Sequence, residues 1–243
     1  DFTLVAMDQI INQIAKTRYI FGGKAVIPLV IRGQQGVGRG NAATHSQSME
    51  AVFLHFPGLK VAMPSDASDA AGLLRTAIRD DNPVMFFEHK ALYTSKCEVD
   101  DSPDFSVPFG KARILREGTD VTIIATHTYV QKSLNVAEKL AAEGISAEVI
   151  DPRTLVPMDW DAMAASVEKT GRAVVVHEAH RTGGVGAEIA AELSERTFRY
   201  LDSPILRLGA KSCPLPFNLG LENAVVPQES DIYAACKRAL YQA

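Results

Sequence analysis

The chain has 243 residues, of which 47% are hydrophobic and 22% charged, and its formal net charge is −4. This charge argues against nucleic acid as a partner, and no apolar run is long enough to cross a membrane. The three cysteines Cys97, Cys213 and Cys236 are too far apart for a disulfide framework or a CxxC zinc motif, which favours a reducing compartment.

The opening segment DFTLVAMDQIINQ has neither a basic start nor an apolar signal core, so no export signal is expected. Its helical pattern begins without a capping residue, which predicts that the chain starts partway into a domain. Further along, segments with helical periodicity alternate with short apolar runs. The predicted helices cover residues 4–21, 46–56, 66–80, 129–144, 158–171, 183–198 and 229–242. The predicted strands cover residues 25–31, 59–64, 83–88, 121–126, 146–151, 172–178 and 204–210.

This alternation is typical of an α/β fold with mainly parallel sheets, and the continuously apolar strands indicate helices on both faces. The periodicity lapses between residues 91 and 118, where prolines, glycines and an acidic cluster predict a linker. We therefore expect a first domain at 1–90, truncated at its N-terminus, and a second at 119–243.

A glycine-rich loop, RGQQGVGRGNAATHSQS at 32–48, follows a predicted strand and precedes a predicted helix. Its glycines Gly36, Gly38 and Gly40 match neither a P-loop nor the GxGxxG dinucleotide motif. Thr44 and Gln47 have the spacing of a capping box, which would place His45 in the first turn of a helix and favour its neutral form. His45 is then either a proton-transfer group or a plain residue at a helix start.

Four longer segments resemble the beta subunits of thiamine-diphosphate-dependent 2-oxo acid and acetoin dehydrogenases. They are HSQSMEAVFLHFPGLKVAMPS with the following DNPVMFFEHKALY, VPFGKARILREGTDVTIIA, EVIDPRTLVPMD and VVVHEAHRTGGVGAEIA. The resemblance implies a pyrimidine-binding domain followed by a transketolase C-terminal-like domain. It also implies that the cofactor lies at an interface with an alpha subunit that binds the diphosphate and its Mg²⁺.

The resemblance implies roles for individual residues. His45 matches the active-site histidine of the family, and Phe2 matches the aromatic residue that packs against the aminopyrimidine ring. Read without the resemblance, Phe2 is an ordinary core residue. The glutamate that activates the cofactor in the family would lie before residue 1, so the sequence as given is not expected to activate thiamine diphosphate.

The resemblance also implies a bound potassium ion. Its ligands would be the main-chain carbonyl groups of Leu29, Ala77, Ile78 and Asp80, together with Asn82. Carbonyl groups at the end of a helix lack partners within the helix and carry partial negative charge, so cation binding there is physically reasonable. The alternative is a plain helix end, because Asn82-Pro83 stops the helix.

As an enzyme subunit, the chain would act in an α2β2 heterotetramer on a 2-oxo acid, with pyruvate as the first expectation and acetoin or a branched-chain 2-oxo acid as alternatives. Its acyl product would pass to the lipoyl domain of an acyltransferase. The chain could instead act mainly as a scaffold that binds the subunit-binding domain of that acyltransferase. A non-catalytic anion-binding protein is a third, remote reading. The expected compartment is the cytoplasm, or the mitochondrial matrix in a eukaryote.

Other motifs are expected to be structural. HEAH at 177–180 lacks the HExxH spacing of zinc proteases, and the glycines in TGGVGAE either receive an anion or let a helix pack closely on the sheet. Arg32 and Arg39 either attract an anionic substrate or are solvated. The triplet of residues 88–90 is expected to have a structural role.

Overall fold

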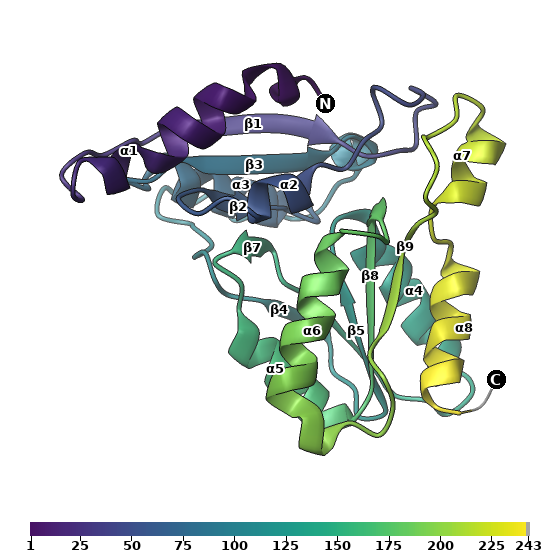
Figure 1. The fold of residues 1–243 in the computed structure, drawn as a ribbon. Helices are drawn as coiled ribbons and strands as arrows, with labels where there is room; N and C mark the ends of the chain where they lie inside the picture. Colours follow the sequence, from purple (N-terminus) through teal and green to yellow (C-terminus); the bar gives the residue numbers. More distant parts are fainter. Residues whose placement is uncertain (242–243) are drawn as a thin grey trace.

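The computed structural model describes residues 1–241 and contains two β-sheets (Figure 1). The first sheet has the order β1 (Val30–Gln35), β3 (Val84–His89), β2 (Lys60–Ala62) and β7 (Thr154–Val156). The second has the order β4 (Arg113–Arg116), β6 (Ala147–Asp151), β5 (Val121–Ala125), β8 (Ala173–His180) and β9 (Leu206–Ala210). Pairing is parallel except at β7 and β4, each at one edge of its sheet. The predicted α/β class is confirmed.

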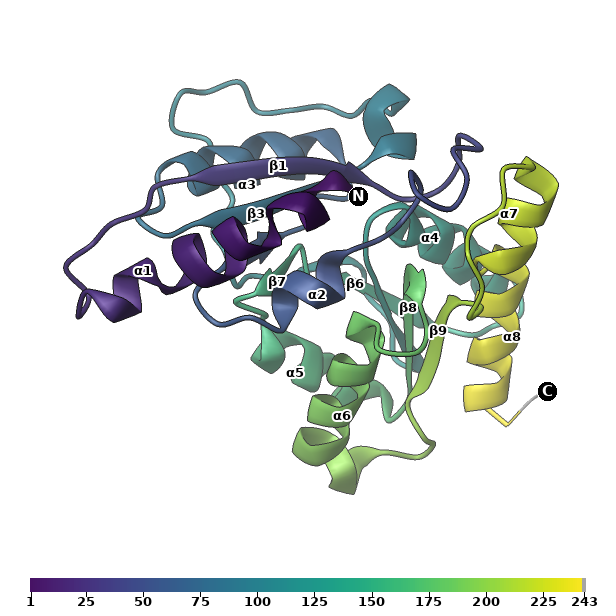
Figure 2. The ribbon, with the colours of Figure 1, turned by 45° about the horizontal axis from the view of Figure 1, so that its top comes forward.

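Helices surround both sheets (Figure 2). On the first sheet they are α1 (Ala15–Ile20), α2 (Glu50–Leu54) and α3 (Ala67–Ile78), and α1 continues the short helical segments η1 (Phe2–Ala6) and η2 (Asp8–Ile14). On the second they are α4 (Thr128–Ala141), α5 (Trp160–Thr170), α6 (Val185–Thr197) and α8 (Glu229–Ala239). Shorter helices are η3 (Lys90–Thr94), η4 (Phe198–Tyr200) and α7 (Leu219–Val225).

Several helix ends follow from local side-chain chemistry. Asp66 begins α3 by accepting a hydrogen bond from the backbone N–H of Asp69 at 2.7 Å. Asp159 accepts one from the N–H of Ala162 in the same way at the start of α5, and Gly171 ends that helix with φ +68°. Gln228 and Asp231 form a capping box at the start of α8. Residue 242, the last of the predicted closing helix, and residue 243 lie outside the described residues.

The structure corrects three predictions about elements and adds two elements that were not predicted. The strand expected at 25–31 runs from 30 to 35, because Pro28 has no N–H to donate to a neighbouring strand. The helix expected at 46–56 covers only 50–54. The segment expected as a linker contains strand β4, and β7 and α7 were not predicted at all. The proposed domain limits of 1–90 and 119–243 remain a prediction.

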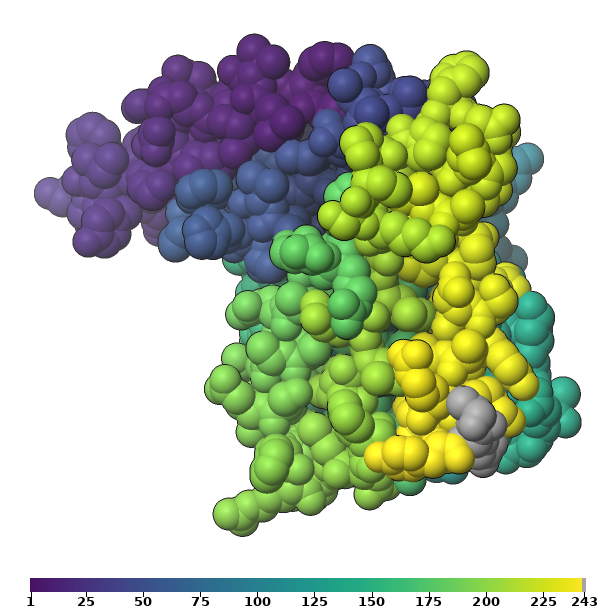
Figure 3. All heavy atoms as spheres, turned by 45° about the vertical axis from the view of Figure 1, so that its right-hand side comes forward, coloured from purple at the N-terminus to yellow at the C-terminus, as the bar shows by residue number. Residues whose placement is uncertain are grey.

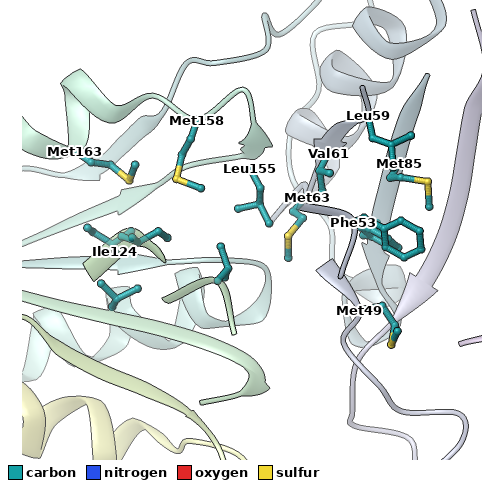
Figure 4. Close-up of a cluster of buried hydrophobic side chains, with 14 of the residues drawn as sticks. Met49, Phe53, Leu59, Val61, Met63, Met85, Ile124, Leu155, Met158 and Met163 are labelled. Atoms are coloured by element: carbon teal, nitrogen blue, oxygen red, sulfur yellow. The ribbon is translucent and has the colours of Figure 1, made fainter. Parts of the chain in front are cut away.

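One hydrophobic core runs through both halves of the chain (Figure 4). Met63, next to β2, and Leu155, on β7, point toward one another across the junction, and both are almost completely buried. Their neighbours include Phe53 and Met85 on the first sheet's side and Met158 on the second's. Since burying one such side chain contributes about 1.5–3 kcal/mol, this shared core fixes the two sheets relative to each other.

Candidate active site

The glycine loop begins at the carboxyl end of β1, beside the carboxyl end of the neighbouring strand β3. Ligands of open α/β sheets bind at this edge. Gly36 has φ +96°, and a Cβ there would lie 2.2 Å from the His89 ring and 2.6 Å from the Glu178 carboxylate. Gly36 is therefore required both by its backbone conformation and by the close approach of two buried side chains.

Two buried carboxylates of the second half of the chain bind the loop. The N–H of Val37 donates to Glu178 Oε1 at 2.7 Å, and the N–H of Gly38 donates to Glu222 Oε2 at 3.0 Å. Glu178 lies on β8 and Glu222 on α7. Sequence reasoning missed both residues, because they lie about 140 and 180 positions beyond the loop and belong to no local motif.

His45 lies in an exposed turn after the glycines, with its ring against Phe2. The two ring centroids are 5.2 Å apart in an edge-to-face arrangement. The Thr44 hydroxyl is 2.9 Å from His45 Nδ1, and the buried Lys90 ammonium donates to the His45 carbonyl group. The structure thus brings Phe2 and His45 together.

The predicted helical setting of His45 is wrong. Helix α2 begins at Glu50, with Met49 as its N-cap, so the helix dipole does not act on His45. The Thr44 hydroxyl contacts the His45 ring rather than a helix N–H. The N–H of Gln47 donates to the Asp1 carboxylate at 3.1 Å. This contact fixes the first residues, and Phe2 with them, beside the loop; Phe2 is 67% exposed and not a core residue.

Buried titratable groups lie directly beneath the loop. His89 Nε2 and Glu178 Oε2 are 2.8 Å apart. Burial alone would raise the pKa of Glu178, but hydrogen bonds from His89 and Val37 lower it below its usual range. Burial raises the pKa of Glu50, whose carboxylate accepts from the Gln35 amide at 2.9 Å, to about 7. Burial therefore favours the protonated form of Glu50 up to about neutral pH.

The residues named for a potassium ion lie near one another at the opposite end of β1 and β3. The N–H of Val84 donates to the Leu29 carbonyl, and Asp80 follows the end of α3. The Asp80 carboxylate forms an ion pair with Lys60 and accepts from the N–H and side-chain amide of Asn82. A cation here would use carbonyl oxygens, since Asp80 already has a cationic partner.

The remaining sequence motifs make contacts within the chain. Arg32 forms an ion pair with Glu88 at 2.6 Å, and Arg39 donates to the Lys90 carbonyl at 2.9 Å. A Cβ on Gly184 would lie 2.4 Å from the buried His177 ring, so this glycine lets α6 pack closely on the sheet, as one reading of the sequence predicts. Within residues 1–241, no group of three His, Cys, Asp or Glu side chains is placed to bind a metal ion, and no helix is long and apolar enough to span a membrane.

A surface hollow of about 470 Å³ lies beside the loop that carries His45. It is lined by residues of the loop, among them Thr44 and Gln47, and by residues of the second half of the chain, among them His180, Cys213 and Leu215. The loop that carries His45 therefore borders a space large enough for a small substrate or a cofactor segment.

The folds of the two halves define a transketolase-like protein. The profile described as "Transketolase, pyrimidine binding domain" matches residues 1–96, and "Transketolase, C-terminal domain" matches residues 110–232. A solved structure titled "Split gene transketolase, inactive beta4 tetramer" has a TM-score of 0.76 and 26% identity, covering 98% of this chain and 72% of that one.

Sequence relatives show which transketolase-like proteins this chain is similar to. The pyruvate dehydrogenase E1 component subunit beta of Rickettsia felis is 45% identical, over 99% of this chain and 74% of the relative. The acetoin:2,6-dichlorophenolindophenol oxidoreductase subunit beta of Cupriavidus necator is 45% identical, over 99% of this chain and 71% of the relative. The pyruvate dehydrogenase subunit of Rhizobium meliloti is 44% identical, and the chain spans 53% of its length.

The chain belongs to the family of beta subunits of thiamine-diphosphate-dependent 2-oxo acid and acetoin dehydrogenases.

Proposed function

We propose that this chain is the beta subunit of an enzyme that decarboxylates a 2-oxo acid, pyruvate in the first place, and passes the acyl group to protein-bound lipoamide. Two relatives at 44–45% identity carry the pyruvate dehydrogenase name, which supports pyruvate ahead of acetoin or a branched-chain 2-oxo acid. The acetoin-linked relative is equally similar at 45%, so acetoin is the first alternative.

The observation that carries the proposal is the contact between Phe2 and His45 at the strand ends. An exposed aromatic ring beside an exposed imidazole fits a planar heterocycle such as an aminopyrimidine, which would stack on Phe2. Thiamine diphosphate, when bound, supplies an electron sink for the carbanion chemistry. Thr44 engages His45 Nδ1, so Nε2 is the nitrogen available to donate or accept a proton at the substrate.

An alpha subunit is the proposed partner in an α2β2 tetramer, where it would bind the diphosphate and Mg²⁺. Exposed apolar side chains support a partner: Val5 (87% exposed) and Phe217 (77%) lie in segments close to the site, and Tyr19 (89%) lies at the far end of the N-terminal helical segment. Figure 3 shows the N-terminal segment (purple) projecting to the left beyond the rest of the chain, and the region around α7 (yellow-green) at the upper right, with residues drawn in blue between them. Apolar side chains on such a projection favour burial against another polypeptide.

Three finer assignments belong to the same proposal. Potassium would bind the carbonyl groups near Leu29, the end of α3 and Asn82. The acyltransferase would contribute a lipoyl domain that reaches His45, and its subunit-binding domain would contact the second half of this chain. The compartment would be the cytoplasm in a bacterium or the mitochondrial matrix in a eukaryote. The name of the Oryza sativa relative (45% identical, 65% of its length covered) calls that protein mitochondrial.

Co-expression of the full gene with its alpha partner tests the proposal. The complex is assayed for reduction of an artificial electron acceptor with pyruvate, acetoin and branched-chain 2-oxo acids, in the presence of thiamine diphosphate and Mg²⁺. His45→Ala is expected to keep assembly and lower kcat at least about a hundredfold, the contribution typical of a proton-transfer group. His55→Ala, which removes another exposed histidine, is the matched control and should keep its activity. Full turnover by His45→Ala would refute the catalytic assignment.

A further inference from the structure

The second sheet has a topological switch point, the place at which open α/β proteins bind ligands. Its strand order places β6 on one side of β5 and β8 on the other, so the connections diverge at the carboxyl ends of β5 and β8. Such a point of divergence is the usual ligand site in these sheets. In this chain, the first half of the protein fills it.

Contacts at that point come from β3 and from the glycine loop. His127, just after β5, has its Nε2 3.0 Å from the Phe87 carbonyl oxygen. Glu178, near the end of β8, contacts His89 with one oxygen and the Val37 N–H with the other. The Ser48 hydroxyl also donates to Glu178, at 3.3 Å. The carboxylate therefore contacts the chain on both sides of His45.

A second carboxylate repeats the arrangement one residue further on. Glu222 is fully buried and accepts the N–H of Gly38. Both carboxylates attract the Lys90 ammonium group electrostatically. Burial lowers the pKa of Lys90, and the charges of Glu178 and Glu222 only partly oppose that effect. Its ammonium group donates to the His45 carbonyl. Consecutive loop N–H groups, which in nucleotide-binding proteins face a phosphate, here face carboxylates of the same chain.

We propose that Glu178, assisted by Glu222, is a positioning residue for His45: it fixes the glycine loop through its backbone N–H groups and so sets where the imidazole stands. This inference rests on the proposed catalytic role of His45. It also gives the second half of the chain a role in the reaction, because the carboxyl ends of its strands β5 and β8 hold the loop that carries His45.

The test uses the complete alpha–beta complex and the isosteric substitution Glu178→Gln. We expect a roughly tenfold lower kcat, with KM for the 2-oxo acid within about twofold, since the substrate-binding groups are unchanged. Hydrogen exchange in a peptide covering residues 36–48, followed by mass spectrometry, should be about tenfold faster, because Val37 loses a charged acceptor.

Glu148→Gln is the matched control. Glu148 is also fully buried and also accepts a glycine N–H, that of Gly118 at 3.2 Å, but on the far side of the second sheet's core from the loop. It should lower the melting temperature and leave both kcat and the exchange of residues 36–48 unchanged. If Glu178→Gln prevents assembly, Glu222→Gln provides the same test through Gly38.

Unchanged loop exchange in Glu178→Gln would overturn the inference. So would an equal loss of kcat in Glu148→Gln, because it would show a general effect of stability. Loss of turnover in His45→Ala together with full kcat in Glu178→Gln would remove the positioning role alone. Full turnover in His45→Ala would instead remove the proposed function, and the positioning role with it.

Discussion

Substitution of Gly36 by alanine is the sharpest test of how the loop is built. At φ +96° a residue with a Cβ is strained by about 1–2 kcal/mol. The new methyl group would also stand 2.2 Å from His89 Nε2 and 2.6 Å from Glu178 Oε1, distances that no real Cβ contact reaches. The two side chains would have to separate, and leaving the buried Glu178 carboxylate without this hydrogen-bond partner costs about 1–3 kcal/mol.

The expected total for Gly36→Ala is therefore about 2–5 kcal/mol, a large part of the stability of an ordinary domain. At about 2–4 °C per kcal/mol for a chain of this size, the melting temperature should fall by about 4–20 °C. Gly144→Ala is the control: Gly144 has φ +80° with nothing within 4 Å of its would-be Cβ, so only the backbone strain applies. An equal loss in both variants would show that the contact with His89 and Glu178 does not matter.

Three further predictions concern other parts of the fold. Glu50→Gln should remove a pH dependence of the free energy of unfolding. The pKa of Glu50 is about 7 in the fold and 4.5 ordinarily, so the folded chain keeps a proton that the unfolded chain releases. Stability of the wild type relative to this variant should then fall as the pH rises from 4.5 to 7, by about 1.4 kcal/mol per unit in urea unfolding; a constant difference would contradict it. Gly184→Ala should lower the melting temperature by several degrees, because its Cβ would lie 2.4 Å from the His177 ring, and a neutral result would mean that α6 can move away freely. If potassium binds as proposed, potassium chloride should raise the melting temperature more than sodium chloride does, and Asn82→Ala should abolish the difference; equal melting in both salts would exclude the ion.

The fold class was predictable because its signal is local and repeated. The apolar runs at 83–88 and 121–126 correspond to β3 and β5, which are buried along nearly their whole length. Strand β1 was misplaced for the opposite reason: its residues 32–35 are polar or glycine, and only the pairing with β3 makes them a strand. Gln35 is buried because its amide bonds to Glu50, a partner that periodicity does not reveal.

The family, too, was predictable from sequence, since long segments carry it, and the relatives confirm it. The setting of His45 was not. Thr44 and Gln47 have capping-box spacing, but their polar groups bind elsewhere, Thr44 to the His45 ring and the Gln47 N–H to Asp1. Thr44 and Gln47 could form a capping box only if a helix began at Thr44. Tertiary contacts delay the start of α2 to Glu50.

The glycine loop shows that a local pattern can be recognised as unusual while its physical cause stays hidden in distant residues. Glycines after a strand suggest backbone N–H groups turned toward a bound anion. Here the anions are Glu178 and Glu222, so the loop is occupied by its own chain and is fixed before any ligand arrives. A loop whose conformation is set in advance loses little entropy when substrate binds, which favours an accurately placed imidazole at His45. The glycines are then required by the carboxylates behind the loop, and their substitution should impair activity even if no glycine touches the cofactor.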